Sequence, residues 1–229
     1  MTPEALQDRI LYRDADVLVL DKPAGIAVHK APGAGANLEP LLPALAFGLK
    51  TPPALAHRLD RDTSGCLVLG RHPQALRRLM ALFAEGAVDK TYWAVVQGTP
   101  PGVAGVVEQP ILKVHRGRDW QMITDPRGQP AVTEWRVLGQ GEGASWLELK
   151  PRTGRTHQIR VHCAWLGCPV VGDQAYGARP GVGERLHLHA RGVKFRLGPK
   201  DPVVDVVAAP PLHMRPALAE CGYRAEASE

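Results

Sequence analysis

Glycine and proline recur along the whole length of this chain. The 229 residues include 24 glycines and 21 prolines, which are dispersed rather than gathered into one low-complexity segment. Both residues interrupt helices and strand interiors, so only short elements joined by many turns can form between them. No internal repeat is visible. The chain is therefore expected to fold into many short strands and few helices.

Apolar and β-branched runs between these breakers mark the expected strands. The first two runs form a predicted hairpin across Asp14–Asp16. The four-residue apolar run Cys66–Leu69 is typical of a buried strand. The expected strands are 10–12, 17–20, 66–69, 91–96, 103–108, 131–138 and 146–149.

Helical patterns are fewer. Apolar residues recur at helical spacing over 73–83, which predicts a helix there. A second helix is expected over 157–166, with Thr156 as its N-cap, and a third, short helix over 38–48. Many strands and few helices, without regular βαβ alternation, indicate an α+β fold around a mixed, mostly antiparallel sheet with flanking helices. No linker is evident, so one domain is expected over residues 1–229.

Membrane and secretory classes are not expected. No stretch approaches about 18 uninterrupted apolar residues. The start, MTPEALQDRI, lacks the basic region and apolar run of a secretory signal. Cys66, Cys163, Cys168 and Cys221 show neither CxxC spacing nor a dense framework. A reduced, cytoplasmic compartment is therefore predicted.

The excess positive charge is concentrated in one part of the sequence. The net charge is +5, but residues 150–200 hold 10 basic and 2 acidic residues and so carry +8. Residues 1–149 sum to zero and residues 201–229 to −3. Clustered lysine and arginine gain counterion-release free energy on a phosphate backbone, which points to a nucleic-acid partner. A solvated basic face is the alternative interpretation.

The densest polar segment is HRLDRDTSG, residues 57–65. It contains two arginine–aspartate pairs and leads directly into the expected buried strand at Cys66. Charges that enter a core strand cost free energy unless they are paired, so the segment is either a structural ion-pair cluster or a site. Arginines on both sides favour the ionised form of a carboxylate, as a nucleophile or a base requires.

Two further segments carry polar groups. RTGRTHQIRVH, residues 152–162, places arginines and histidines around a turn and a helix start, which suits an anion. KTYWAVV, residues 90–96, places Tyr92 in an otherwise apolar strand. Taken alone, Tyr92 fits an ordinary buried tyrosine better than a functional one.

No metal or cofactor is expected. His157 and His162 are five residues apart and diverge on a helix, unlike the pair four apart in zinc enzymes. Cys163 and Cys168 have the wrong spacing for a zinc knuckle. The sequence motifs of phosphate loops, dinucleotide-binding folds and serine hydrolases are missing.

The order of the motifs is specific. HRLDRDTSG, KTYWAVV, TGRTHQIRVH, VVGDQAYG and RLHLHA, in that order, resemble the RluA-type family of RNA pseudouridine synthases. The amino-terminal ILYRDADVLVLDKPAGIAVH is similar to that family's opening strands and lysine–proline loop, so the resemblance covers about residues 9–200. It implies a single catalytic domain with a central cleft. The implied enzyme is an isomerase that flips specific uridines of tRNA or ribosomal RNA and converts them to pseudouridine.

The resemblance also implies roles for individual residues. Asp60, the aspartate of HRLD, matches the family's catalytic residue. Tyr92 matches the tyrosine that packs on the target base, and Arg160 matches the arginine that pairs with the catalytic carboxylate. Whether the carboxylate acts covalently or as a base is left open.

Three substrate contacts follow from the same motifs. Arg58 is implicated in filling the gap left by the flipped nucleotide. Arg155 is a candidate for a substrate phosphate, or for the pairing assigned to Arg160, and His157 is a further substrate-binding candidate. The loop 113–128 is expected either to contact RNA or to be a solvated loop.

Partners and alternatives complete the hypothesis. Some family members carry a separate amino-terminal RNA-binding domain, but only eight residues precede the matching region, so that domain is expected to be absent. RNA is the expected partner, with no obligate protein partner and a monomeric state. A catalytically silent relative that binds RNA is the main alternative, and a metal hydrolase that uses the histidines is a weaker one.

Overall fold

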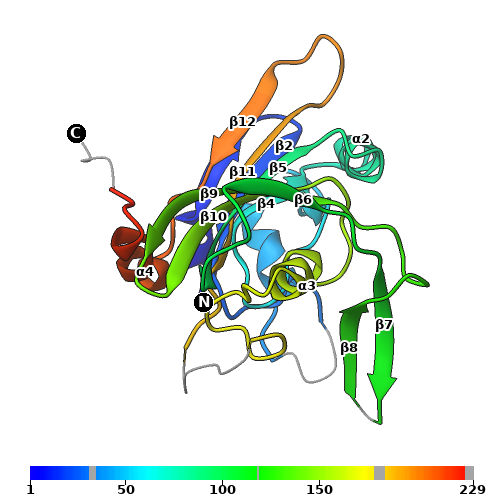
Figure 1. Ribbon diagram of the computed structural model, residues 1–229. Helices are drawn as coiled ribbons and strands as arrows, with labels where there is room; N and C mark the ends of the chain where they lie inside the picture. The colour runs from blue at the N-terminus through cyan, green and yellow to red at the C-terminus, as the bar shows by residue number, and fades with distance from the viewer. Residues whose placement is uncertain (31–34, 118, 178–183, 225–229) are drawn as a thin grey trace. The chain divides into compact units, whose positions relative to one another are not determined.

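The computed structural model describes residues 1–30, 35–117, 119–177 and 184–224. Short strands make up most of its regular structure, with short helices between them (Figure 1). The strands are β1 (Ile10–Arg13), β2 (Val17–Lys22), β3 (Ala54–Leu55), β4 (Ser64–Gly70), β5 (Asp89–Gln97), β6 (Ala104–Val107), β7 (Ile111–Arg116), β8 (Asp119–Thr124), β9 (Thr133–Gly141), β10 (Ala144–Pro151), β11 (Leu188–Arg196) and β12 (Val203–Val207). The helices are α1 (Pro3–Gln7), α2 (Pro73–Ala84), α3 (Gln158–Trp165) and α4 (Arg215–Glu220), with the 3-10 helices η1 (Glu39–Leu45) and η2 (Leu212–Met214).

The chain forms two compact units. The first contains Met1–Lys90 and His189–Ala209, and the second contains Thr91–Leu188 and Pro210–Glu229. Each unit is therefore assembled from two separate stretches of sequence. Because compact units need not fold independently, the expectation of a single catalytic domain over residues 1–229 stays a prediction.

The sheet of the first unit brings two motif loops together. Its strands follow the order β1–β2–β4–β11, with β3 on β4 and β12 on β11. The pair β4 and β11 is parallel, and the other pairs of this unit are antiparallel. Lys22, at the end of β2, lies opposite Gly65, near the start of β4. The loop that follows β2 is therefore adjacent to the HRLDRDTSG segment that precedes β4.

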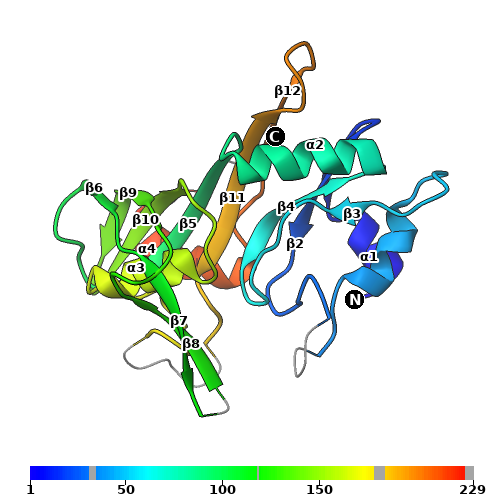
Figure 2. The same ribbon diagram turned by 90° about the vertical axis from the view of Figure 1, so that its right-hand side faces the viewer.

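Helix α2 packs along β4 and closes the core of the first unit (Figure 2). The two backbones approach closely because Gly70 has no side chain, since a Cβ there would lie 2.6 Å from the Cα of Leu76. His72 begins the helix: its Nδ1 accepts the Ala75 N–H at 3.3 Å, and its Nε2 lies 2.7 Å from Oδ1 of Asp16. The expected helix over 73–83 is observed with nearly the same bounds.

The second unit has a four-stranded antiparallel sheet, β5–β10–β9–β6, between two helices. Successive side chains of a strand point to opposite faces. Ala94 and Leu147 therefore pack in the cluster that includes α3, whereas Val95 and Trp146 pack with Leu218 of α4. The strands β7 and β8 form a separate hairpin.

The expected α+β class with a mostly antiparallel sheet is confirmed. The expected strands coincide with observed strands to within a few residues. The expected short helix over 38–48 is a 3-10 helix, and Pro43 in its interior disfavours an α-helix, because its ring clashes with the preceding turn and it has no N–H to donate. The segment 113–128, expected as a loop, contributes to the β7–β8 hairpin. Within the described ranges, each helix is too short or too polar to cross a membrane.

Candidate active site

The HRLDRDTSG segment forms a turn that leads into β4. Leu59 is buried, whereas Arg58 is exposed and Asp60 is half-buried. The turn is closed by a hydrogen bond from the Thr63 N–H to the carbonyl oxygen of Asp60, at 3.2 Å. The buried leucine therefore anchors the segment and leaves Arg58 and Asp60 with access to solvent.

His57 fixes the beginning of the same segment. Its ring stacks on Phe83 of α2 with 4.3 Å between ring centroids, and its Nε2 accepts the Val68 N–H at 3.0 Å. Burial, together with the nearby charge of Lys90, lowers the pKa of His57 to about 3. The ring is therefore neutral near pH 7, and its role in the motif is to hold the turn against α2 and β4.

Lys22 fixes the turn from the other side. Its side chain is fully buried, and its Nζ donates to the carbonyl oxygens of Pro23 at 2.9 Å, Ile26 at 2.8 Å and Arg61 at 2.9 Å. Burial lowers its pKa to about 8, although nearby carboxylates, including that of Asp60, oppose this shift. The lysine thus joins the loop after β2 to the turn that carries Asp60, and it adds positive charge beside that turn.

The start of α3 differs from the sequence prediction. Thr156 was expected to cap this helix, but the N-cap position is taken by His157, whose side chain makes no capping hydrogen bond. His157 has a left-handed backbone conformation, with φ of 55°, which turns the chain sharply into the helix. Because of this sharp turn, the N-cap position lies one residue later than the expected cap at Thr156.

Gln158, the first residue of α3, binds the loop that precedes the helix. Its Oε1 accepts the Arg155 N–H at 3.0 Å and the Thr153 hydroxyl at 2.7 Å. Its Nε2 donates to the Val132 carbonyl oxygen at 3.0 Å and to Oγ1 of Thr133 at 2.9 Å. All four hydrogen-bonding positions of the buried amide are occupied, so the loop that carries Arg155 is fixed to the sheet.

Arg160 projects from α3 into a buried ion pair. Its Nε lies 2.7 Å from Oδ2 of Asp173, and its Nη2 lies 2.7 Å from Oδ1 of the same residue. The Asp173 side chain is 0% exposed and that of Arg160 is 12% exposed. Two parallel bonds of this kind hold the plane of the guanidinium group as well as its position.

An aromatic cluster lies next to Arg160. Tyr176 places its ring 5.0 Å from the guanidinium carbon of Arg160, and its hydroxyl lies 2.8 Å from Nδ1 of His157. The same hydroxyl accepts the Met122 N–H of β8 at 3.2 Å. The His157 ring in turn stacks on Trp120, with 5.3 Å between centroids. The hairpin β7–β8 is thus attached to the start of α3.

Tyr92 lies in β5, where it is half-buried and pairs in register with Leu149 of β10. Its ring packs against the apolar cluster beneath α3. Strand pairing therefore determines where this tyrosine lies.

The residues singled out by the sequence fall in both units. Asp60 and Arg58 belong to the first, and Tyr92, Arg155, His157 and Arg160 belong to the second. The pairing of Arg160 with Asp60 stays a prediction.

Two residues of these sites were missed by sequence reasoning. Lys22 was marked only by its place in the apolar run VLVLDKP, and Asp173 by the glycine–aspartate pair in VVGDQAYG. Lysine and aspartate side chains are usually exposed. A charged residue inside or shortly after an apolar run was therefore the sequence signal that could have indicated their burial.

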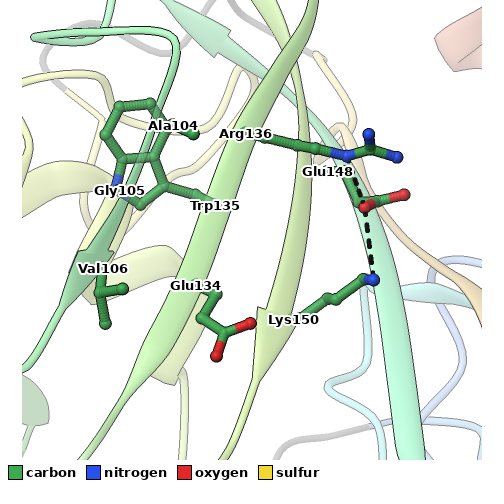
Figure 3. A pocket seen from close by; sticks show the side chains of 8 residues that line it. All are labelled: Ala104, Gly105, Val106, Glu134, Trp135, Arg136, Glu148 and Lys150. Carbon is green, nitrogen blue, oxygen red and sulfur yellow. Dashed lines mark hydrogen bonds and ion pairs between the residues drawn. The ribbon is translucent and has the colours of Figure 1, made fainter.

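A hollow of about 620 Å³ opens over β6, β9 and β10, and none of the candidate site residues is among those that line it (Figure 3). Its charged walls are Glu134, Arg136, Glu148 and Lys150, so the two acidic residues balance the two basic ones. Arg136 Nε lies 2.8 Å from Oε1 of Glu148, and Lys150 Nζ lies 3.7 Å from the same oxygen. This lining offers no excess positive charge to a phosphate group.

Among the residues that the structure describes, no three histidine, cysteine, aspartate or glutamate side chains are grouped as metal ligands would be. The four cysteines are buried free thiols.

Comparison with known proteins gives a consistent set of relatives. The family model described as RNA pseudouridylate synthase matches residues 16–165. An uncharacterized RNA pseudouridine synthase of Zymomonas mobilis is 41% identical over 208 residues, which cover 90% of this chain and 95% of that protein. The ribosomal large subunit pseudouridine synthase C of Vibrio cholerae is 36% identical over 227 residues, which cover 94% of this chain and 70% of that protein.

A solved structure agrees with these relatives. Human RNA pseudouridylate synthase domain containing 4 superposes with a TM-score of 0.81 at 29% identity, over 96% of this chain and 95% of that one.

Proposed function

Because the chain belongs to the RluA-type family of RNA pseudouridine synthases, and is thus an isomerase of uridine in RNA, we propose that it modifies specific uridines of ribosomal RNA or tRNA with Asp60 as its catalytic residue. The observation that carries this proposal is the fixed turn around Asp60. Lys22 and His57 hold the turn at both ends, while Asp60 itself is half-buried.

The reaction needs few groups. The bond between C1′ and N1 of the uridine breaks, the uracil rotates, and a bond forms between C1′ and C5. The hydrogen on C5 is lost and N1 gains one, so no atom enters or leaves overall. A single carboxylate, either as a nucleophile on the nucleoside or as a base, is sufficient for such a reaction. We propose this role for Asp60, whose neighbouring charges include Lys22.

The other motif residues complete the proposed site. Tyr92 stacks on the flipped uracil, a contact worth roughly 1–3 kcal/mol, and Arg160 pairs with Asp60 to keep it ionised away from water. Arg58 fills the space of the flipped nucleotide. Arg155 and His157 contact the substrate backbone.

The RNA class is proposed from relatives and from the hairpin. The name of the Vibrio cholerae relative refers to the large ribosomal subunit, which favours ribosomal RNA as the first candidate. Lys113 and Trp120 supply a cation and an exposed aromatic ring on the β7–β8 hairpin, a pairing of residue types that suits unpaired RNA. We propose that the enzyme acts as a monomer in the cytoplasm, which fits its four unpaired cysteines.

The direct test maps pseudouridine in RNA. Total ribosomal RNA and tRNA from a strain that lacks this protein are incubated with the purified chain, and carbodiimide mapping then locates new pseudouridines. The wild-type protein should introduce pseudouridine at one or a few positions. Asp60→Asn should introduce none, while its melting temperature and RNA affinity stay close to those of the wild type.

Two results would contradict the proposal. Absence of new pseudouridine in every RNA class would remove the enzymatic function and favour the silent RNA-binding relative. Full turnover by a folded Asp60→Asn protein would move the catalytic role to another residue.

A further inference from the structure

We propose that Asp173 and Tyr176 are positioning residues that set the direction in which Arg160 presents its guanidinium group. This inference rests on the proposed function, in which Arg160 pairs with the catalytic carboxylate. Neither Asp173 nor Tyr176 was among the residues that the sequence motifs assigned to the site. Both follow α3 in a tight turn, four residues from Asp173 to Tyr176.

The carboxylate of Asp173 is itself held rigidly. In addition to the two bonds from Arg160, its Oδ1 accepts the backbone N–H groups of Ala175 at 2.9 Å and Tyr176 at 3.1 Å. The preceding residue is Gly172, with φ of +74°, and a Cβ at that position would collide with the Arg185 carbonyl group. The backbone therefore has little freedom to move Asp173 relative to the sheet.

Tyr176 supports the guanidinium group from a second direction. The guanidinium carbon lies over the Tyr176 ring, 5.0 Å from its centroid, while Asp173 binds one edge of the same group. Two hydrogen bonds at one edge and an aromatic ring next to the central carbon together restrict the orientation of the group. The Tyr176 hydroxyl accepts the Met122 N–H and contacts His157, so the support is attached both to the hairpin and to the start of α3.

The pattern of donors indicates how this orientation serves the reaction. An arginine side chain has five N–H donors, and Asp173 takes two of them, on Nε and Nη2. The other three N–H donors of the guanidinium group are not used by Asp173. Asp173 thus aims Arg160 without occupying the edge that a second carboxylate needs.

A purely stabilising ion pair is the competing interpretation. Buried ion pairs add little net stability compared with an apolar pair of the same size, but removal of one partner is destabilising. Loss of stability in a variant therefore does not separate the two interpretations. The separation requires a rate measurement and a double-mutant cycle, because a positioning residue acts only through the residue that it positions.

The experiment measures single-turnover pseudouridine formation at saturating RNA, the RNA dissociation constant and the melting temperature. Asp173→Asn keeps the shape of the side chain but removes the charge and one acceptor. We expect the rate to fall about 30-fold or more, with the dissociation constant within about threefold of the wild type. Tyr176→Phe, which keeps the ring and removes only the hydroxyl, should lower the rate about 3- to 10-fold.

The cycle uses Arg160→Lys, which keeps a cation but cannot make two parallel bonds. In the Arg160→Lys protein, the further change Asp173→Asn should lower the rate less than about twofold. Matched controls are Glu134→Gln, which removes the partner of the exposed Arg152, and Tyr223→Phe, which alters another packed tyrosine. Both controls should keep the wild-type rate.

Each outcome decides the inference. A folded Asp173→Asn protein with a near wild-type rate would overturn the inference. A double variant, Arg160→Lys with Asp173→Asn, whose rate loss equals the product of the two single losses would also overturn it. Either result leaves the proposed function intact. If Asp173→Asn does not fold, the same cycle with Tyr176→Phe gives the decision, with full multiplication again as the contrary result. Absence of pseudouridine formation by the wild type would overturn the proposed function, and this inference with it.

Discussion

Lys22 and His57 lie beside the turn that carries Asp60, and both are ionisable side chains whose pKa burial lowers. Their hydrogen bonds go to backbone groups of the turn and its neighbouring strands rather than toward solvent. A buried polar group without its hydrogen-bond partners costs free energy. Lys22 and His57 therefore favour the single conformation of the turn in which their hydrogen bonds form. The turn that carries Asp60 is thus held by two side chains that bond to the backbone around it.

His57 makes the stability of the protein sensitive to acid. Its pKa is about 3 in the folded state and near the ordinary histidine value of 6.5 in the unfolded chain, so the unfolded chain takes up the proton first as the pH falls. The contribution of neutral His57 to the free energy of unfolding is therefore complete above pH 6.5. It is lost as the pH falls from 6.5 to 3, and this loss is no more than about 5 kcal/mol. His57→Gln, whose amide oxygen can still accept the Val68 N–H, should flatten this part of the pH dependence in urea unfolding.

The control for this prediction is the exposed His115, where His115→Gln should leave the pH dependence unchanged. Equal acid sensitivity of the wild type and His57→Gln would show that His57 is not the responsible group.

Roles for single residues could be predicted from the sequence where the order of motifs carried the information. Asp60 and Tyr92 were singled out in this way, because each occupies a fixed place in a motif, and their roles stay predictions. Lys22 and Asp173 were not, because their importance comes from burial and from partners distant along the chain. No local pattern states which charged residue will be buried, since burial depends on how strands pair.

At the scale of elements, the start of α3 depends on an internal polar network rather than on an ordinary cap. Gln158→Glu would replace an amide that donates to Val132 and Thr133 with a carboxylate that cannot donate. We expect a loss of roughly 2–4 kcal/mol in the free energy of unfolding, measured by urea titration. Gln140→Glu makes the same change at an exposed site and should cost less than about 0.5 kcal/mol. Similar losses in the two variants would argue against the network.

The β7–β8 hairpin shows why an element can be hidden in a sequence. Its strands carry lysine, histidine, arginine and aspartate around a glycine, a composition that equally fits a solvated loop. The hairpin forms because Ile111 and Met122 pack with Val161 of α3, a contact between residues far apart in the chain. Tertiary packing, which the sequence pattern does not display, therefore decides between loop and strand.

The hairpin is expected to contact RNA through Trp120. This side chain is 43% exposed, and Lys113 lies over its ring with Nζ 4.6 Å from the centroid. Trp120→Ala should weaken RNA binding by roughly 1–3 kcal/mol, or about 5- to 150-fold in the dissociation constant. Trp165→Ala removes a tryptophan that is 50% exposed on α3 and serves as the matched control in filter binding. An equal effect of both variants, or none of Trp120→Ala, would exclude the hairpin as a binding element.

At the scale of the whole molecule, the charge concentrated in residues 150–200 does not belong to one compact unit. The stretch is divided between the two units, which separate after Leu188. Several of its cations are also paired locally, as Arg152 is with Glu134 and Lys194 with Asp205. A net charge counted along the sequence predicts the kind of partner, but the ion pairs decide which cations are available to phosphate groups.

Arg155 provides the test of this distinction. Its side chain is exposed, and its Nε donates to the carbonyl oxygen of Pro130, which leaves the cation without neutralisation by that partner. If Arg155 contacts an RNA phosphate, Arg155→Ala should make the slope of log affinity against log salt shallower by about 0.7–0.9. The measurement uses the RNA that the enzyme modifies, and both proteins carry Asp60→Asn so that no turnover occurs during binding.

The matched control is Lys194→Ala, which removes an exposed cation whose Nζ lies 2.6 Å from the Asp205 carboxylate. Because that cation is already neutralised by a carboxylate, its removal should leave the salt dependence unchanged. A salt slope unaffected by Arg155→Ala would mean that Arg155 does not contact an RNA phosphate. Equal reductions by Arg155→Ala and Lys194→Ala would mean that net charge alone governs RNA binding. The expected contrast between the two variants would instead assign the binding to cations that the fold leaves available.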